Sequence, residues 1–275
     1  MERTTSDGAS PIEPNPHTES ANPIVGTQME GAVAVLTMQY PPHNLFDLAL
    51  TRAVIDALAW ARGQGARAVV LNSAMRHFSA GADLKAIENG LGEDGGQLLL
   101  ELLGAFREHP APIIASVHGV CVGGGLEIAL ACDFVIAAES SKLGCVEPIV
   151  GLHPLMGAIQ RISQRAGELR AKEMAMFGRR FDAQTLERWN MINRVVPDAR
   201  LASATMVLAR ELAAGPTVAH AATKKLAAVA ASQGVEAADK AMLEIQKAVF
   251  ASRDFANAVA SYRERGPGFA MFEGR

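Results

Sequence analysis

The stretch His118-Gly-Val-Cys-Val-Gly-Gly-Gly-Leu-Glu127 decides the fold of this chain. It follows Ile113 to Val117, an apolar run that is typical of a strand buried on both faces. The three glycines then predict a turn that leads into the start of a helix. Such a turn also suits close packing alone, so the motif by itself leaves a purely structural role open.

Two phosphate-binding motifs are excluded for this turn. A P-loop needs Lys and Ser or Thr where Gly125 and Leu126 stand. The dinucleotide fingerprint needs spaced glycines, whereas Gly123, Gly124 and Gly125 are contiguous. An oxyanion hole remains, because the first N–H groups of a helix have no intrahelical acceptor and attract developing negative charge.

The neighbouring segments alternate between strand and helix patterns. Val33, Val35 and Thr37 indicate a strand, and Asp47 is a plausible N-cap for a helix that Gly63 ends. Residues 68–71 and 134–137 are short apolar runs that resemble buried strands. This order favours an α/β fold.

We expect three regions along the chain. Residues 1–23 are rich in proline and polar groups and are expected to form a flexible tail. The α/β core is expected over residues 24–200, with an acidic, glycine-rich connection at 88–96. Residues 201–275 show helical spacing, and their apolar stripes require burial against the core or a partner subunit.

Composition excludes several classes of function. The 26 basic and 29 acidic residues give a net charge of −3, which argues against nucleic-acid binding. No apolar run is long enough to span a membrane and no secretory signal is visible, so we expect a cytoplasmic protein. The three cysteines form no C-x-x-C pair, so we expect neither a disulfide framework nor a metal site.

A second loop, Phe78-Ser-Ala-Gly-Ala-Asp-Leu-Lys85, follows the buried strand at 68–71. Together with Val122-Gly-Gly-Gly-Leu-Glu127, it resembles the enoyl-CoA hydratase/isomerase (crotonase) superfamily. The resemblance extends over residues 24 to 272. Further matches are Cys132-Asp133, Gly151-x-x-Pro154, Gln160-Arg161 and Tyr262-x-x-x-x-Pro267-x-Phe269.

The resemblance implies a crotonase-like (ββα) spiral core with a C-terminal helical segment for oligomerisation, as a homotrimer or homohexamer. It implies that the backbone N–H groups of Ala82 and Gly124 hold the thioester oxygen of an acyl-CoA substrate. CoA enters as part of the substrate, and no other cofactor is expected. The resemblance places further substrate-binding residues at Ala80, Asp83, Leu84, Lys85, Gly123 and Leu155.

Glu127 and Glu147 stand where the similar hydratases carry two glutamates that share one water. Taken alone, Glu127 is explained by the helix dipole and Glu147 by an ordinary loop position. Their joint placement behind two oxyanion loops favours an enoyl-CoA hydratase, which adds water to a 2-trans-enoyl-CoA and gives a 3-hydroxyacyl-CoA. Two carboxyls near an apolar chain repel each other, so at least one should have a raised pKa.

Departures from the family pattern at Leu155 and Pro148 keep two alternatives open. Pro148 restricts Glu147 toward extended conformations. Leu155 stands where a glycine N–H often contacts the catalytic water. The first alternative is an isomerase, or other enolate chemistry on an acyl-CoA. The second is an acyl-CoA-binding protein whose catalysis has decayed.

Overall fold

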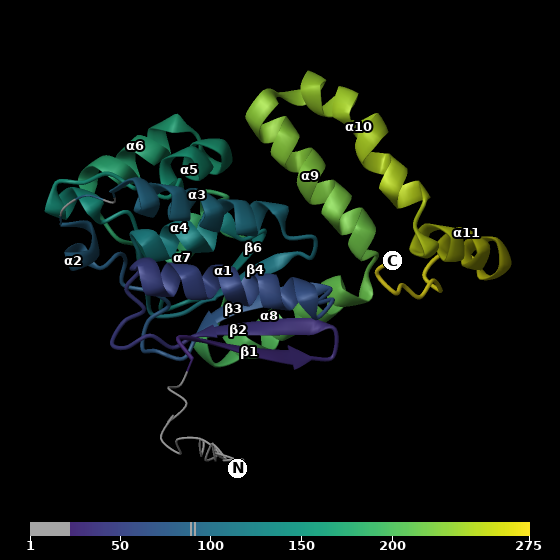
Figure 1. The fold of residues 1–275 in the computed structure, drawn as a ribbon, viewed down its shortest axis with the longest axis horizontal. Helices are drawn as coiled ribbons and strands as arrows, with labels where there is room; N and C mark the ends of the chain where they lie inside the picture. Colours follow the sequence, from purple (N-terminus) through teal and green to yellow (C-terminus); the bar gives the residue numbers. More distant parts are fainter. Residues whose placement is uncertain (1–22, 89, 91) are drawn as a thin grey trace, which may run out of the picture.

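The computed structural model describes residues 23–88, 90 and 92–275. Apart from Pro23, the tail expected over residues 1–23 lies outside the described residues. Figure 1 shows an α/β core from which the last helices project as an extended arm. The arm is made of α9 (Thr217–Gln233), α10 (Val235–Phe250) and α11 (Arg253–Arg265).

A six-stranded sheet forms the centre of the core, in the order β1-β2-β3-β4-β6-β9. β1 pairs with β2 in the antiparallel direction and the other neighbours are parallel. The α/β class expected from the sequence is confirmed. The strands are β1 (Val25–Glu30), β2 (Val33–Met38), β3 (Ala68–Ser73), β4 (Ile113–Val117), β6 (Phe134–Ala138) and β9 (Arg194–Val196).

Both faces of this sheet are covered, which explains its continuous apolar strands. Along β3, Val69 and Leu71 face the main core, and Ala68 and Val70 face the opposite side. The main core is closed by α1 (Leu48–Gly63), α3 (Gly92–Glu108) and α4 (Gly124–Ala131). The opposite side is closed by α8 (Leu201–Ala214), so packing assigns α8 to the core, although its sequence pattern grouped it with the C-terminal helices.

A second, three-stranded sheet joins β5 (Val120–Val122), β7 (Lys142–Gly144) and β8 (Phe181–Asp182). β5 and β7 are parallel, so their carboxyl ends lie at the same edge. β5 leads into α4, and β7 leads into the 3₁₀ helix η1 (Glu147–Val150). This small sheet therefore brings the segments that carry the two glutamates side by side.

The sequence predicted the start of α1 correctly and the start of α3 less accurately. Asp47 caps α1 by accepting a hydrogen bond from the Leu50 amide. α3 begins at Gly92, inside the connection expected at 88–96, where acidic residues favour a helix start. The remaining helices are α2 (Leu84–Ile87), α5 (Ala158–Ala166), α6 (Glu168–Phe177), α7 (Ala183–Arg188) and the 3₁₀ helix η2 (Asp198–Arg200).

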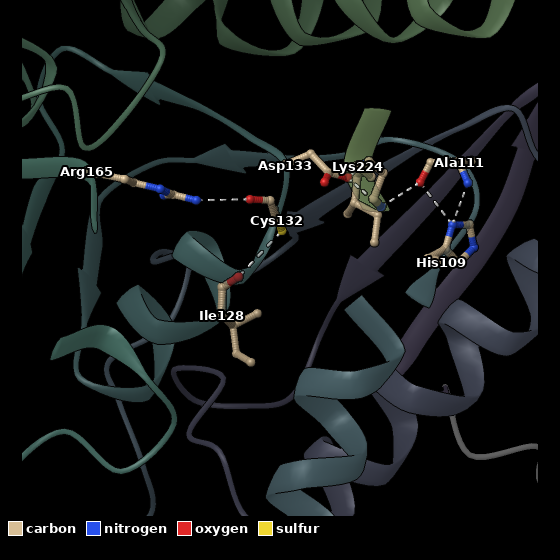
Figure 2. A network of polar contacts seen from close by, with 8 residues as sticks. His109, Ala111, Ile128, Cys132, Asp133, Arg165 and Lys224 are labelled. Atoms are coloured by element: carbon tan, nitrogen blue, oxygen red, sulfur yellow. Dashed lines mark hydrogen bonds and ion pairs between the residues drawn. The ribbon is translucent and has the colours of Figure 1, made fainter. Parts of the chain in front are cut away.

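Lys224 on α9 fastens the arm to the core (Figure 2). Its Nζ lies 2.7 Å from Asp133 Oδ2 and donates to the Ala111 carbonyl at 3.2 Å. Asp133 Oδ2 also accepts from the Ile113 amide at the start of β4. Burial raises the pKa of Asp133, and the ammonium of Lys224 opposes that rise. Loss of the cation would leave the carboxylate largely buried and unpaired.

We predict that Lys224→Met lowers the free energy of unfolding by about 2–3 kcal/mol, because breaking a buried ion pair by removing one partner is costly. Lys225→Met is the matched control, since Lys225 is the exposed neighbour on α9. Thermal unfolding followed by circular dichroism should show a lower Tm for Lys224→Met only. Equal Tm values for the two variants would contradict a role of this ion pair in holding the arm.

Candidate active site

The loop at residues 78–83 docks on the edge of β5. The Ser79 amide donates to the Val120 carbonyl and the Val122 amide donates to the Ser79 carbonyl, each at 3.2 Å. A Cβ on Gly125 would lie 2.6 Å from Ser79 Cβ and 2.9 Å from the Ser79 carbonyl oxygen. Only glycine permits this approach. Two loops distant in sequence are thereby held against each other.

This docking places the amides of Ala82 and Gly124 beside each other. Ala82 N lies 3.7 Å from the position that a Cβ on Gly124 would occupy. Gly123 N-caps α4 at φ 53° and ψ −129°, a conformation suited to glycine, which leaves Gly124 as the first helical residue. Among the described residues, neither amide has a hydrogen-bond acceptor. Two free donors therefore lie at one place on the wall of a cavity.

That cavity has a volume of about 510 Å³ and is lined mainly by aliphatic side chains. All the site residues expected from the sequence line it, the four catalytic and the six substrate-binding ones alike. Sequence reasoning missed Arg180 in the lining, and it missed the segment at 45–48 that leads into α1. An apolar cavity with a few convergent polar groups is the usual form of a small-molecule site.

Glu127 lies on the first turn of α4 and is only 2% exposed. Its Oε1 accepts hydrogen bonds from the amides of Met156 at 2.6 Å and Ala158 at 3.1 Å. Burial raises the pKa of Glu127 to about 7; the charge of Glu147 adds to the rise, and the amide donors oppose it. Glu127 is therefore able to exchange a proton near neutral pH.

Glu147 begins η1 and faces the same cavity. Both of its carboxyl oxygens are buried, and neither has a hydrogen-bond partner among the described residues. Its Oε1 lies 3.4 Å from the position of a Cβ on Gly123, directly beside the glycine turn. Burial raises its pKa. A buried carboxyl without a partner is costly, so this one is suited to a group that enters the cavity.

The remaining expected residues form the rim and walls. Asp83 caps α2 by accepting from the Lys85 amide at 2.9 Å, so its carboxylate holds the loop at this end of the cavity. Lys85 is exposed, and the Ala80 amide is engaged by the His43 carbonyl. Leu155 is 39% exposed at the cavity, and the amides of the residues that follow it still reach Glu127.

Other kinds of site are not found in the part of the chain that the structure describes. No group of three or more His, Cys, Asp or Glu side chains there is placed to hold a metal ion. Cys121, Cys132 and Cys145 are buried free thiols. None of the described helices is long and apolar enough to cross a membrane.

Backbone donors beside two buried carboxyls, carried by a parallel sheet and a smaller second sheet, define the crotonase class of enzyme. A family model described as Enoyl-CoA hydratase/isomerase matches residues 28–273. The chain belongs to the enoyl-CoA hydratase/isomerase family, which acts on acyl-CoA thioesters. The crotonase-like architecture expected from the sequence is therefore confirmed.

Individual relatives agree with this assignment. The chain is 35% identical over 192 residues to a "Probable enoyl-CoA hydratase" of Rhizobium meliloti (strain 1021), covering 68% of this chain and 74% of the relative. It is 32% identical over 246 residues to a protein of the same name from Rhodobacter capsulatus, covering 87% and 95%. The crystal structure of an enoyl-CoA hydratase from Bacillus anthracis matches with a TM-score of 0.83 at 26% identity, covering 92% and 100%.

The raised pKa of Glu127 gives a prediction about stability and pH. Its folded-state pKa is about 7 and its ordinary value is 4.5, so between these values the folded state binds more protons than the unfolded state. Stability is then lost as pH rises through this window. Because glutamine does not titrate, Glu127→Gln should gain about 2–3 kcal/mol relative to wild type between about pH 5 and about pH 8.

Thermal unfolding at the two pH values measures this difference. Glu211→Gln, at an exposed position on α8, is the control and should follow wild type at both. A constant difference in Tm between Glu127→Gln and wild type would show that the Glu127 carboxyl is not destabilised by its surroundings.

Proposed function

We propose that this protein is an enoyl-CoA hydratase that adds water to a 2-trans-enoyl-CoA and gives a 3-hydroxyacyl-CoA. One observation carries the proposal: both Glu147 oxygens are buried without a partner, in a cavity that also holds the free amides of Ala82 and Gly124 and the carboxyl of Glu127. An isomerase needs only one proton carrier, whereas hydration uses two carboxyls and a water.

The two amides would receive the thioester oxygen. As charge moves from the double bond onto this oxygen, the Ala82 and Gly124 N–H groups stabilise the enolate, and each such donor is worth about 2.7–4 kcal/mol in the barrier. Because the donors belong to the main chain, the side chains need only be small enough to admit the thioester. Alanine and glycine meet this requirement.

The two carboxyls divide the proton transfers. Glu127 accepts two amide hydrogen bonds, which favour its carboxylate form, so we assign it to accept the proton of the water that attacks C3. Burial is the largest influence on Glu147 and raises its pKa, and its two oxygens lack hydrogen-bond partners, so we assign it to deliver a proton to C2. The net result is addition of H and OH, after which Glu127 loses its proton and Glu147 regains one.

Lys85 and Arg180 are the cations on the cavity lining, and we propose that Lys85 contacts the phosphates of CoA. The arm exposes large apolar side chains on α10 and α11, among them Leu243, Phe250 and Tyr262. A homotrimer or homohexamer would cover these residues, and we propose that assembly for the cytoplasmic enzyme.

Loss of absorbance of the conjugated thioester, with crotonyl-CoA and longer enoyl-CoAs, tests the reaction. Glu127→Gln and Glu147→Gln should each lower kcat by about 10²–10⁴-fold, the usual contribution of general acid–base catalysis. Glu139→Gln, at an exposed position, should leave kcat unchanged.

The other outcomes identify the two alternatives. Double-bond isomerisation that survives in Glu147→Gln, with no hydration by any variant, would replace the hydratase by an isomerase. Tight binding of the thioester without turnover of any enoyl-CoA would make the protein an acyl-CoA-binding protein. Equal hydration rates for wild type and Glu127→Gln would remove the proposed role of Glu127.

A further inference from the structure

The turn at residues 155–158 supports Glu127, and Arg161 supports that turn. Arg161 lies one turn into α5 and extends back toward the start of the helix. Its Nη1 donates to the Gly157 carbonyl at 3.1 Å and contacts the Met156 carbonyl at 3.4 Å. The amides on either side of these carbonyls, from Met156 and Ala158, donate to Glu127 Oε1. The guanidinium thus holds the Gly157–Ala158 peptide group, whose N–H donates to Glu127, and it also contacts the carbonyl of Met156, the residue that supplies the second donor.

The position of the Arg161 guanidinium requires glycine at residue 157. A Cβ at Gly157 would lie 2.2 Å from Arg161 Nη1, and the residue has φ of 93°. Only glycine both adopts this backbone conformation and leaves room for the guanidinium to cross it. Arg161 does not line the cavity, so it acts through the turn and not on a bound molecule.

The charge of Arg161 acts in the same direction as its hydrogen bonds. Burial lowers the pKa of Arg161, and the carboxylate of Glu127 opposes that change. Since the attraction is mutual, the guanidinium favours the ionised form of Glu127. The other titratable or charged groups near the pair are Glu147, Cys145, Arg107, Arg165, Cys132 and, beside Glu147, His153.

We infer that Arg161 is a positioning residue that holds the Met156–Ala158 turn beneath Glu127 and thereby favours the ionised form of this carboxyl. The consequence for activity rests on the proposed hydratase function, but the effect on the ionisation of Glu127 does not. Removal of the guanidinium takes away a nearby cation and loosens two amide donors, and both changes favour the neutral acid.

Arg165 provides a matched control on the same helix. It is also partly buried, and it donates to the carbonyls of Leu130, Cys132 and Met191 (Figure 2 shows the contact with Cys132). These contacts lie at the C-terminal end of α4 and at Met191, and none of them involves the turn that holds Glu127. A general loss of packing in α5 would therefore affect variants of both arginines, whereas the proposed role belongs to Arg161 alone.

The experiment measures the pKa of Glu127 directly in the intact protein. Infrared difference spectroscopy follows the carboxyl C=O band against pH, and Glu127→Gln identifies the band that belongs to Glu127. Arg161→Met should raise this pKa by about one pH unit or more, the usual effect of losing a nearby opposite charge. Arg161→Lys, which keeps the charge, should recover part of the change, and Arg165→Met should match wild type.

Kinetics form the second readout. The acidic limb of the kcat/KM profile should move to higher pH in Arg161→Met, and kcat should fall by about tenfold or more near neutral pH with KM nearly unchanged. An unchanged Glu127 pKa in folded Arg161→Met or Arg161→Lys, or an equal change in Arg165→Met, would overturn the inference. If wild type hydrates no enoyl-CoA, the proposed function fails, and the infrared measurement still decides the role of Arg161.

Discussion

The contact between Ser79 and Gly125 is the constraint on which the site depends. It leaves no room for a side chain at Gly125, and it lets the loop at 78–83 pair with the edge of β5. The amides of Ala82 and Gly124 come from segments far apart in the sequence, and this pairing is what places them together. Ser79 is buried and does not line the cavity, yet the positions of both donors follow from its contact with Gly125.

The site also holds two carboxyls in buried positions, where the ionised form is electrostatically unfavourable. Glu127 is held nearly out of solvent with a pKa of about 7, and Glu147 is buried with no partner. A large two-sided core supplies the stability that tolerates such groups, and activity requires that they stay poorly solvated. The turn that carries Met156 and Ala158 limits the cost at Glu127 by giving its carboxylate two donors. Glu147 receives no hydrogen bond from this turn, and it faces the cavity.

Sequence patterns were sufficient for the α/β class and for the buried strands β3 and β4, and the family resemblance supplied ten of the residues that line the cavity. These rest on local chemistry, such as the Asp47 cap, or on motifs that carry their own geometry. The small sheet was not predicted, because β5 and β7 have three residues each and show no periodicity. The sequence pointed to Arg161 only as part of a motif match, because its contacts depend on how the peptide groups of Met156 and Gly157 are oriented in the fold. Leu155 replaces a glycine of the family pattern, but the hydrogen bonds to Glu127 come from the amides of Met156 and Ala158, which follow it.

The donors at Ala82 and Gly124 are main-chain N–H groups, so almost any amino acid at these two positions can supply them. Every amino acid except proline carries this hydrogen, so point mutations at these codons alter bulk and backbone strain and leave the donors in place. The carboxyls at 127 and 147 have no such protection, since one base change can remove either. Over evolutionary time, a chain of this kind can therefore lose or exchange its carboxyls while the pair of main-chain donors persists.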